Sequence, residues 1–253
     1  MEIVIAVSRL STNLVGFVGI WQVDPTFPAK LTLMPEPRPV VAAFDLDGTL
    51  TEGGSVVKWL SRVAGVATTY RAMASHLPSL AYGALMSGTA ADTAKESLFR
   101  RTLQGRTLEE VTEASRDFAH HHVAKELRPA VRARLDEHLA LGHRVVLVSA
   151  SPELYVGVIA EFLGAHGYLG TRLAVDPLGR LTGGYLGNNC RGEEKLRRLT
   201  EWVDHLSVGD NKPELYAYGN SRGDRRMLTA ADHPVDCGKL GALGALRAFP
   251  RLG

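Results

Sequence analysis

Short, continuously apolar runs alternate along the chain with longer segments that have helical spacing. Four such runs predict strands buried on both faces of a parallel sheet. They span 40–44, 144–148, 215–218 and 234–237. The segments with helical periodicity are 130–141, 153–163, 193–205 and 224–231. Because alternating strands and helices are joined by right-handed crossovers, the sequence predicts an α/β fold with a doubly wound, Rossmann-like parallel sheet.

Two insertions interrupt this alternation. The stretch 55–125 is mainly helical, rich in Ala and Leu, and too long for a simple crossover, so it predicts an inserted helical cap domain. The stretch 173–185 carries the turn sequence Asp-Pro-Leu-Gly and predicts a β-hairpin. We therefore expect an N-terminal extension, 1–37, a core made of 38–54 and 126–253, and the cap between the two core segments.

Composition and charge narrow the classes of function. The 253 residues include 29 Lys and Arg against 27 Asp and Glu, a formal net charge of +2. This balance, without a long basic run, argues against a nucleic-acid-binding protein. No stretch approaches the roughly 18 uninterrupted apolar residues of a membrane span. Cys190 and Cys237 lie in no metal-ligand spacing and are typical of free thiols in a reducing cytosol, so we expect a cytoplasmic protein.

The first predicted strand runs directly into Asp45-Leu46-Asp47-Gly48. In a doubly wound sheet, ligands bind beyond the carboxyl ends of the strands, and an unpaired buried carboxylate is costly to folding. Two acids at i and i+2 on such a turn can converge on one point, which Mg²⁺ would neutralise through hard oxygen ligands. The alternative is an ordinary Asp-Gly turn. The position at a strand end favours the functional interpretation.

Three further segments carry polar side chains where predicted elements end or begin. They are Ser149-Ala150-Ser151-Pro152 after the second strand, Asn189-Cys190-Arg191-Gly192-Glu193-Glu194-Lys195-Leu196 at a helix start, and Tyr218-Gly219-Asn220-Ser221-Arg222-Gly223-Asp224 after the third strand. Ser151 before Pro152 suits a helix N-cap better than Ser149 does. A lysine in a first helical turn opposes the helix dipole, so stability alone would disfavour Lys195 there.

These four motifs, in this order, resemble the haloacid dehalogenase superfamily, and within it the phosphoserine-phosphatase-like branch with a helical cap. The resemblance covers about 40–246. In that family the first Asp attacks phosphorus to form an aspartyl phosphate, and the second protonates the leaving oxygen and later activates water. The resemblance therefore implies that Asp45 is the nucleophile and Asp47 the general acid/base. Asp47 indicates phosphate chemistry, because a dehalogenase would not need the second acid.

The resemblance also implies a phosphate-binding set. In the family's second motif a hydroxyl and the next backbone N–H hold a phosphate oxygen, and these positions match Ser149 and Ala150. The backbone N–H groups of Leu46 and Asp47 are expected to orient the same oxygens. The positive end of the following helix would add to the attraction.

A cation is expected to offset the charge of the phosphoryl group. The family's lysine lies in the first turn of a helix with a leucine four residues on, and Lys195 with Leu199 matches this pattern. Arg191 is the alternative candidate. A solvated charge on a Glu/Lys/Arg-rich helix face is the other interpretation for Arg191.

The fourth motif departs from the family pattern Gly-Asp-x-x-x-Asp. Asn220 stands at the first acidic position and Asp224 at the second. The resemblance implies a Mg²⁺ cofactor bound by Asp45, Asp47 and Asp224. Asn220 is expected to be a weaker ligand or to act indirectly, since an amide can still offer a neutral carbonyl oxygen. Asp224 can also cap the following helix.

These features predict a Mg²⁺-dependent phosphomonoester hydrolase that acts on a small organic phosphate. Phosphoserine phosphatases carry a Glu nine residues after the nucleophile, where Gly54 stands here, so a different leaving group is favoured. Gly53 and Gly54 instead suggest a hinge next to the cap. The alternatives are a phosphotransferase with the same intermediate and a non-catalytic phosphate-binding relative, which Asn220 alone supports. The sequence indicates no oligomeric state.

Overall fold

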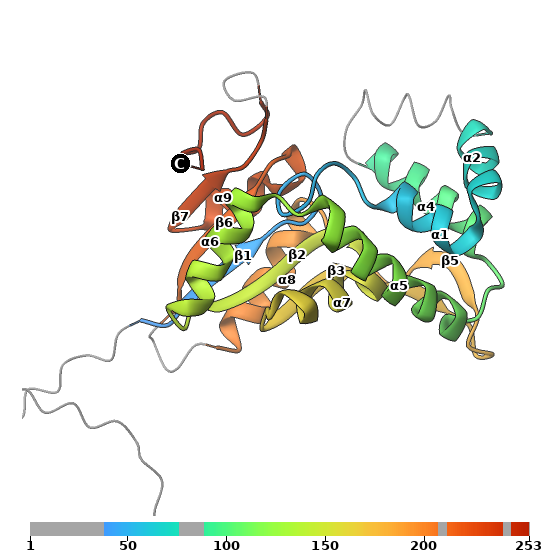
Figure 1. Cartoon of the computed structure of the whole chain (residues 1–253), viewed down its shortest axis with the longest axis horizontal. Coiled ribbons are helices and arrows are strands. Elements are labelled where there is room, and N and C mark those ends of the chain that lie inside the picture. Colours follow the sequence, from blue (N-terminus) through green and yellow to red (C-terminus); the bar gives the residue numbers. More distant parts are fainter. Residues whose placement is uncertain (1–37, 76–88, 207–211, 240–243, 253) are drawn as a thin grey trace, which may run out of the picture. The chain divides into compact units, whose positions relative to one another are not determined.

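The computed structural model describes residues 38–75, 89–206, 212–239 and 244–252. The predicted N-terminal extension, 1–37, lies outside the described residues. Within them, a five-stranded parallel sheet has the order β3-β2-β1-β6-β7 (Figure 1). Its strands are β1 (Val40–Phe44), β2 (Arg144–Pro152), β3 (Gly167–Thr171), β6 (Glu214–Gly219) and β7 (His233–Asp236). All four predicted strands are present, and the predicted α/β fold is confirmed.

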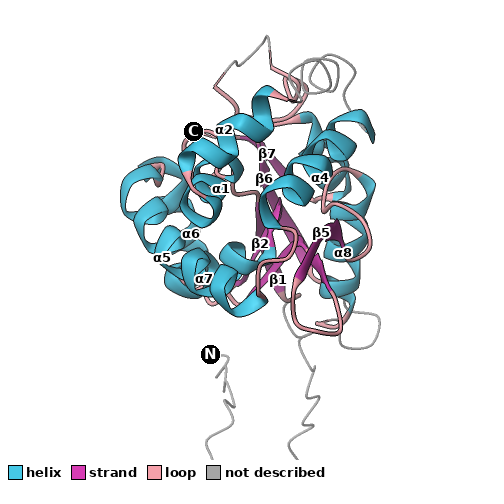
Figure 2. Cartoon of the chain, turned by 90° about the vertical axis from the view of Figure 1, so that its right-hand side faces the viewer, coloured by secondary structure: helices cyan, strands magenta, loops and turns pink. Residues whose placement is uncertain are grey.

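Helices cover both faces of the sheet (Figure 2). Successive side chains of a strand point to opposite faces. Ala42 and Phe44 of β1 therefore pack with α6 and α7, whereas Val41 and Ala43 pack with α8 and α9. These helices are α6 (Pro129–Ala140), α7 (Glu153–Leu163), α8 (Glu193–Asp204) and α9 (Arg225–Ala230). Burial on both faces explains why β1 is a continuous apolar run and could be predicted.

The sequence pattern missed β3 and misplaced several ends. β3 has the sequence Gly-Tyr-Leu-Gly-Thr and pairs only with β2, so it lies at the sheet edge and lacks a continuous apolar run. β2 continues four residues beyond the predicted end, to Pro152. β7 begins at His233, one residue before the predicted start. The helix expected from 224 is preceded by a 3₁₀ turn, η1 (Arg222–Asp224).

The segment 55–125, between β1 and β2, is mainly helical in its described residues, as predicted. It forms α1 (Val56–Ala64), α2 (Val66–Ala74), α4 (Thr89–Leu103) and α5 (Leu108–Glu126). The predicted hairpin is the antiparallel pair β4 (Leu173–Val175) and β5 (Leu181–Tyr185). Helix α4 packs on β5, and a Cβ at Gly183 would lie 2.3 Å from Cα of Arg100. Only glycine permits this close approach, which lets α4 pack directly against β5 of the hairpin.

The two cysteines agree with the prediction of free thiols. Cys190 and Cys237 are free and buried. Three consecutive histidines lie on α5: His122 is buried while His120 and His121 are exposed, because neighbouring positions on a helix point about 100° apart. In the part of the chain that the structure describes, no helix has both the length and the apolar character needed to cross a membrane.

His138 on α6 lies in a buried polar cluster. It is 4% exposed, its Nε2 lies 2.8 Å from the Tyr218 hydroxyl, and its Nδ1 lies 2.7 Å from Nδ1 of His143. Burial, with a smaller effect of His143, lowers the pKa of His138 from 6.5 to about 4. Between these pH values the unfolded chain binds a proton at His138 that the folded protein does not bind.

We therefore expect His138 to make folding stability fall as the pH is lowered from 6.5 towards 4, by up to about 3 kcal/mol. The free energy of unfolding, measured by urea denaturation across this range, should decline less steeply in His138→Gln than in the wild type. His120→Gln, at an exposed position, is the control and should keep the wild-type slope. A wild-type slope in His138→Gln would contradict the assignment.

Candidate active site

The carboxyl ends of β1, β2 and β6 meet at one edge of the sheet. Phe44, Leu147 and Tyr218 occupy one level across these three strands, because β1 pairs in parallel register with both neighbours. The residues that follow this level, including Asp45 and Ser149, therefore lie beside one another at the strand ends. This is the edge at which a doubly wound sheet binds ligands.

Asp45 and Asp224 share the ammonium group of Lys195. Nζ of Lys195 lies 2.7 Å from Oδ1 of Asp45 and 2.5 Å from Oδ1 of Asp224. Asp45, Lys195 and Asp224 are 5%, 2% and 1% exposed. Lys195 lies in the first turn of α8, as the sequence predicted, and its side chain spans the distance from that turn to the strand ends. The structure thus brings together three of the predicted site residues in one buried cluster.

The two carboxyl groups differ in their electrostatic environment. Burial, and then the charge of Asp224, raise the pKa of Asp45 from 3.8 to about 7, against the opposing charge of Lys195. Burial also acts on Asp224, but the charge of Lys195 and the hydrogen bonds from Lys195 and Ser221 outweigh it and lower the pKa of Asp224. The Ser221 backbone N–H and hydroxyl both donate to Oδ2 of Asp224, at 2.9 and 2.8 Å. Asp224 is therefore the carboxylate that holds its negative charge more firmly.

The turn after Asp45 packs against Asn220. Gly48 has a φ of +82°, and a Cβ there would lie 2.1 Å from Nδ2 of Asn220, so glycine is required at this position. The Thr49 hydroxyl donates to Oδ2 of Asp45 at 2.8 Å and lies 3.3 Å from Oδ1 of Asn220. The Thr49 hydroxyl thus lies within hydrogen-bonding distance of both the Asp45 carboxylate and the amide oxygen of Asn220.

Asp47 faces the start of the helical segment. Its Oδ1 accepts the N–H of Ser55 at 2.6 Å, and its Oδ2 accepts the hydroxyl of Ser151 at 2.5 Å. The Ser55 hydroxyl also lies 2.7 Å from the Tyr155 hydroxyl. The prediction that Ser151 caps the next helix is wrong, because α7 has Pro152 at its N-cap and the Ser151 hydroxyl binds Asp47. Sequence reasoning also missed Ser55, although its position before a helical run was a usable signal.

The end of β2, which carries Ser149, is held from several sides. The Ser149 hydroxyl accepts the N–H of Ser151 at 3.0 Å. The Ala150 carbonyl accepts the Thr171 hydroxyl at 2.6 Å and the Lys95 ammonium group at 2.5 Å. Neither partner was predicted: Thr171 ends the missed strand β3, and Lys95 lies within a helical run that offers no distinguishing signal.

Arg128 is another residue that the sequence did not single out. Its guanidinium donates to the carbonyl oxygens of Gly48, Thr49 and Cys237 at 2.6, 3.2 and 2.8 Å. It therefore ties the turn after Asp45 to the segment that follows β7. A guanidinium with several donors in a fixed plane suits this multiple contact.

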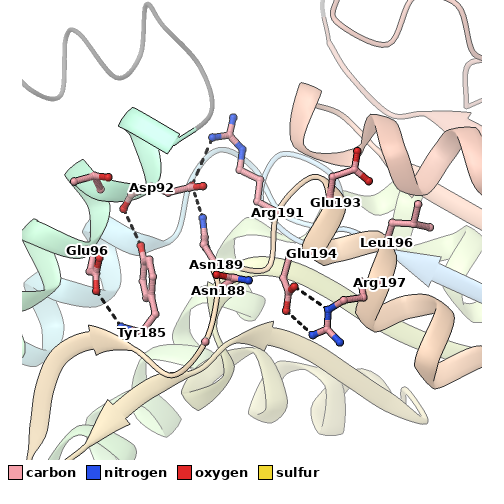
Figure 3. Close-up of a pocket in the computed structure, with 12 residues that line it drawn as sticks. Asp92, Glu96, Tyr185, Asn188, Asn189, Arg191, Glu193, Glu194, Leu196 and Arg197 are labelled. Atoms are coloured by element: carbon pink, nitrogen blue, oxygen red, sulfur yellow. Dashed lines mark hydrogen bonds and ion pairs between the residues drawn. The ribbon is translucent and has the colours of Figure 1, made fainter.

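Arg191, the alternative to Lys195, does not form the contact with Asp45. Its guanidinium lies 3.8 Å from Oδ1 of Asp92 on α4. Both residues line a pocket of about 660 Å³ between α4, β5 and the start of α8 (Figure 3). Asn189 lines the same pocket, and its Nδ2 donates to Asp92 at 2.6 Å. Of the two candidate cations, the structure places Lys195 with the nucleophile candidate.

The carboxylates do not by themselves form a metal centre. Among the described residues, no group of three or more His, Cys, Asp or Glu side chains has metal-binding spacing. Both side-chain oxygens of Asp47 are engaged by Ser55 and Ser151, so this carboxylate does not join Asp45 and Asp224. The donors that remain at the strand ends are the two carboxylates and the amide oxygen of Asn220.

Similarity to known proteins agrees with this arrangement. Residues 42–229 match the profile of the family described as haloacid dehalogenase-like hydrolase. Protein CicA of Caulobacter vibrioides is 35% identical over 195 residues, which cover 77% of this chain and 84% of CicA. Histidinol-phosphatase of Neisseria meningitidis is 26% identical over 128 residues, which cover 50% of this chain and 58% of that protein.

A solved structure shares the fold. A phosphoserine phosphatase carrying an analogue of the phospho-aspartyl intermediate superimposes with a TM-score of 0.56 and 19% identity, over 81% of this chain and 89% of that chain. The family match covers the segments that carry Asp45, Ser149, Lys195 and Asp224. The resemblance found in the motifs is therefore confirmed: the chain belongs to the haloacid dehalogenase superfamily of hydrolases.

Proposed function

We propose that the protein is a Mg²⁺-dependent phosphomonoesterase that works through an aspartyl phosphate on Asp45. The observation that carries the proposal is the buried cluster of Asp45, Lys195 and Asp224, with Asp47 two residues beyond the nucleophile candidate. Burying two carboxylates and an ammonium group is costly for folding, so the cluster is better explained by chemistry than by stability.

The reaction would proceed in two displacements. A carboxylate oxygen of Asp45 forms a bond to phosphorus as the bond from phosphorus to the leaving oxygen breaks, and Asp47 in its acid form protonates that oxygen. Water then attacks phosphorus, Asp47 accepts the proton of the water, and the bond to Asp45 breaks. The products are an alcohol and inorganic phosphate, and both aspartates return to their starting states.

Charge and orientation would come from the surrounding groups. The Lys195 ammonium group, held beside Asp45 at 2.7 Å, would offset the charge that develops on the phosphoryl oxygens. The Ser149 hydroxyl and the backbone N–H groups of Leu46, Asp47 and Ala150 would orient these oxygens. Their placement at adjacent strand ends supports this role.

The donor set suits Mg²⁺. When ionised, Asp45 and Asp224 offer two carboxylates to a single ammonium group, which leaves an excess of negative charge that a cation with hard oxygen ligands would balance. Asn220 would add its neutral amide oxygen, and Asp47 would contribute its carbonyl oxygen because its carboxylate is engaged elsewhere. When bound, Mg²⁺ would neutralise charge on the phosphoryl group.

The substrate would be a small organic phosphate. The name of the Neisseria relative, histidinol-phosphatase, supports this class. Gly54, exposed and without a side chain, occupies the position at which the resemblance places an acid for the amino group of phosphoserine. We therefore propose a leaving group other than serine, selected by the helical segment.

We also propose the division into a core of 38–54 and 126–253 and a cap of 55–125. Helices α1, α2, α4 and α5, which lie within 55–125, support it. A cytoplasmic location remains a proposal, supported by the two free, buried thiols.

Purified protein is expected to release inorganic phosphate from p-nitrophenyl phosphate when Mg²⁺ is present. Removal of the metal with EDTA should lower the rate by about 100-fold or more, because the charge of the phosphoryl group is then less well balanced. A colorimetric phosphate assay with a broad panel of phosphate esters makes the measurement, and Mg²⁺ added in excess of EDTA is the control.

The same assay separates the alternatives. Added glycerol should not reduce phosphate release in favour of glycerol phosphate; transfer to glycerol would identify a phosphotransferase. Absence of phosphate release across the whole panel, with Mg²⁺ present, would identify a non-catalytic relative and contradict the proposal.

A further inference from the structure

Lys95 on α4 reaches from the helical segment to the end of β2. Its Nζ lies 2.5 Å from the Ala150 carbonyl oxygen and 3.1 Å from Oδ1 of Asn189, and it lies 5.6 Å from the centre of the Phe99 ring. Lys95 forms no ion pair with a carboxylate among the described residues. Its ammonium group is thus committed to two neutral oxygen acceptors.

Asp92, one turn before Lys95 on the same helix, does not balance this charge directly. Its carboxylate accepts Nδ2 of Asn189 at 2.6 Å and lies 3.8 Å from the Arg191 guanidinium (Figure 3). The positive charge of Arg191 therefore offsets the negative charge of Asp92. The position of the Lys95 ammonium group is therefore set by its hydrogen bonds to Ala150 and Asn189 and not by an ion pair.

The number of hydrogens shows why these acceptors need Lys95. The Thr171 hydroxyl lies 2.6 Å from the Ala150 carbonyl and 2.7 Å from Oδ1 of Asn189, but it has one hydrogen to donate. An ammonium group has three donors and can serve both acceptors at once. With Lys95 present, both oxygens accept a hydrogen bond, whichever of them receives the Thr171 hydrogen.

The Ala150 carbonyl is part of the peptide group that orients the active site. The N–H of the same peptide, on Ser151, donates to the Ser149 hydroxyl at 3.0 Å. The Ser151 side chain donates to the Asp47 carboxylate at 2.5 Å. Fixing the carbonyl from one side therefore fixes the hydrogen bond to Ser149 on the other side, and it places the donor to Asp47.

We propose that Lys95 is a positioning residue that couples docking of the helical segment to the conformation of the phosphate-holding end of β2, residues 149–151. Lys95 acts through the Ala150 peptide and does not contact the leaving group. When α4 is docked, this end of β2 is held with Ser149 and Ser151 in their working orientations. When α4 moves away, one donor must serve two acceptors and the peptide is free to rotate. This inference rests on the proposed phosphatase function.

Lys95 can be tested by substitution, because Thr171 still supplies one donor when Lys95 is replaced. Lys95→Met is therefore expected to fold, with a lower melting temperature. Lys95→Gln, which keeps two uncharged N–H donors, is the second variant should Lys95→Met fail to fold. Lys125→Met, at an exposed position near the end of α5, is the matched control.

The test compares kcat and KM for three esters with different leaving groups: p-nitrophenyl phosphate, propyl phosphate and phosphoserine. Lys95→Met is expected to lower kcat by about tenfold to 100-fold for all three, the range that loss of a charge-assisted hydrogen bond corresponds to. The fold-changes should agree within a factor of about three. Lys125→Met should match the wild type.

The pH profile provides a readout that a purely structural role would not move. Burial lowers the pKa of Lys95 to about 8, and the charge of Arg191 acts in the same direction. Asp47, Asp92 and Cys190 oppose this shift. Loss of the proton removes the charge that strengthens the hydrogen bonds to Ala150 and Asn189, so wild-type kcat should decline as the pH rises through about 8. Lys95→Arg, which stays protonated, should shift this decline to higher pH.

The outcomes separate the two proposals. Wild-type protein without activity on any ester contradicts the phosphatase function itself. Active wild-type protein with unchanged kcat in Lys95→Met overturns only the positioning role. A loss confined to one ester also overturns it, because Lys95 would then contact the leaving group. If Lys95→Arg does not shift the alkaline decline in kcat to higher pH, the positioning role is likewise overturned.

Discussion

Asp45→Asn should abolish turnover while leaving the protein folded. The amide cannot form the phosphoryl bond, so kcat for p-nitrophenyl phosphate is expected to fall by about 10⁴-fold or more. Asp236→Asn is the matched control, since Asp236 is also buried, at 2% exposure, and ends another strand of the same sheet. Activity of Asp45→Asn close to that of the wild type would overturn the nucleophile assignment and with it the mechanism.

The fold of Asp45→Asn should survive for an electrostatic reason. The pKa of Asp45 is raised from 3.8 to about 7, so the folded protein loses stability from this group as the pH rises through 7 and the buried carboxylate ionises next to Asp224. Asparagine removes this repulsion. Without Mg²⁺ at pH 8, the melting temperature of Asp45→Asn should be at least that of the wild type. A clearly lower melting temperature would show that the carboxylate is needed for folding.

Asp47→Asn should have an effect that depends on the leaving group. A general acid matters most when the departing oxygen is strongly basic, so kcat for propyl phosphate should fall by about 10²- to 10⁴-fold. p-Nitrophenolate needs no proton to leave, so the first displacement on p-nitrophenyl phosphate should be much less affected. Because Asp47 also activates water, the aspartyl phosphate should then accumulate, and rapid mixing should show a burst of p-nitrophenol followed by slow release of phosphate.

Asparagine can keep the contacts that Asp47 makes. Its oxygen can accept the Ser55 N–H, and its amide group can donate to the Ser151 hydroxyl, so the turn should retain its shape. Asp117→Asn, at a half-buried carboxylate on α5 that pairs with Arg62, is the control and should keep the wild-type kcat. An equal loss for both esters in the first displacement would exclude Asp47 as the general acid.

Much of the fold could be predicted because its signals are local. β1 is buried on both faces, so its sequence is apolar throughout and its end at Asp45 is visible without any partner. β3 could not be found in this way, because an edge strand with two glycines gives no continuous apolar run. The pattern therefore predicted the strands of the sheet interior better than its edge.

Ser151 shows where local reasoning failed at the site. A serine before Pro152 has the composition of a helix cap, and this local preference produced the wrong role. Its true partner, Asp47, lies 104 residues earlier, and the pairing depends on the register of β1 and β2 and on the extension of β2 to Pro152. The hydroxyl binds the stronger acceptor, a carboxylate, in preference to a backbone group.

The sequence by itself determined four of the five strands of the sheet. It also determined the place of Asp45 and Asp47 after the first strand, and the place of Lys195 in the first turn of a helix. Burial periodicity and short motifs record such features, because they depend on neighbours in the chain. Only the tertiary structure decided that Lys195 meets Asp45 across 150 residues and that Lys95 holds the Ala150 carbonyl across 55. Hydrogen-bond partners so far apart are set by strand register and helix packing, which no single segment of the chain encodes.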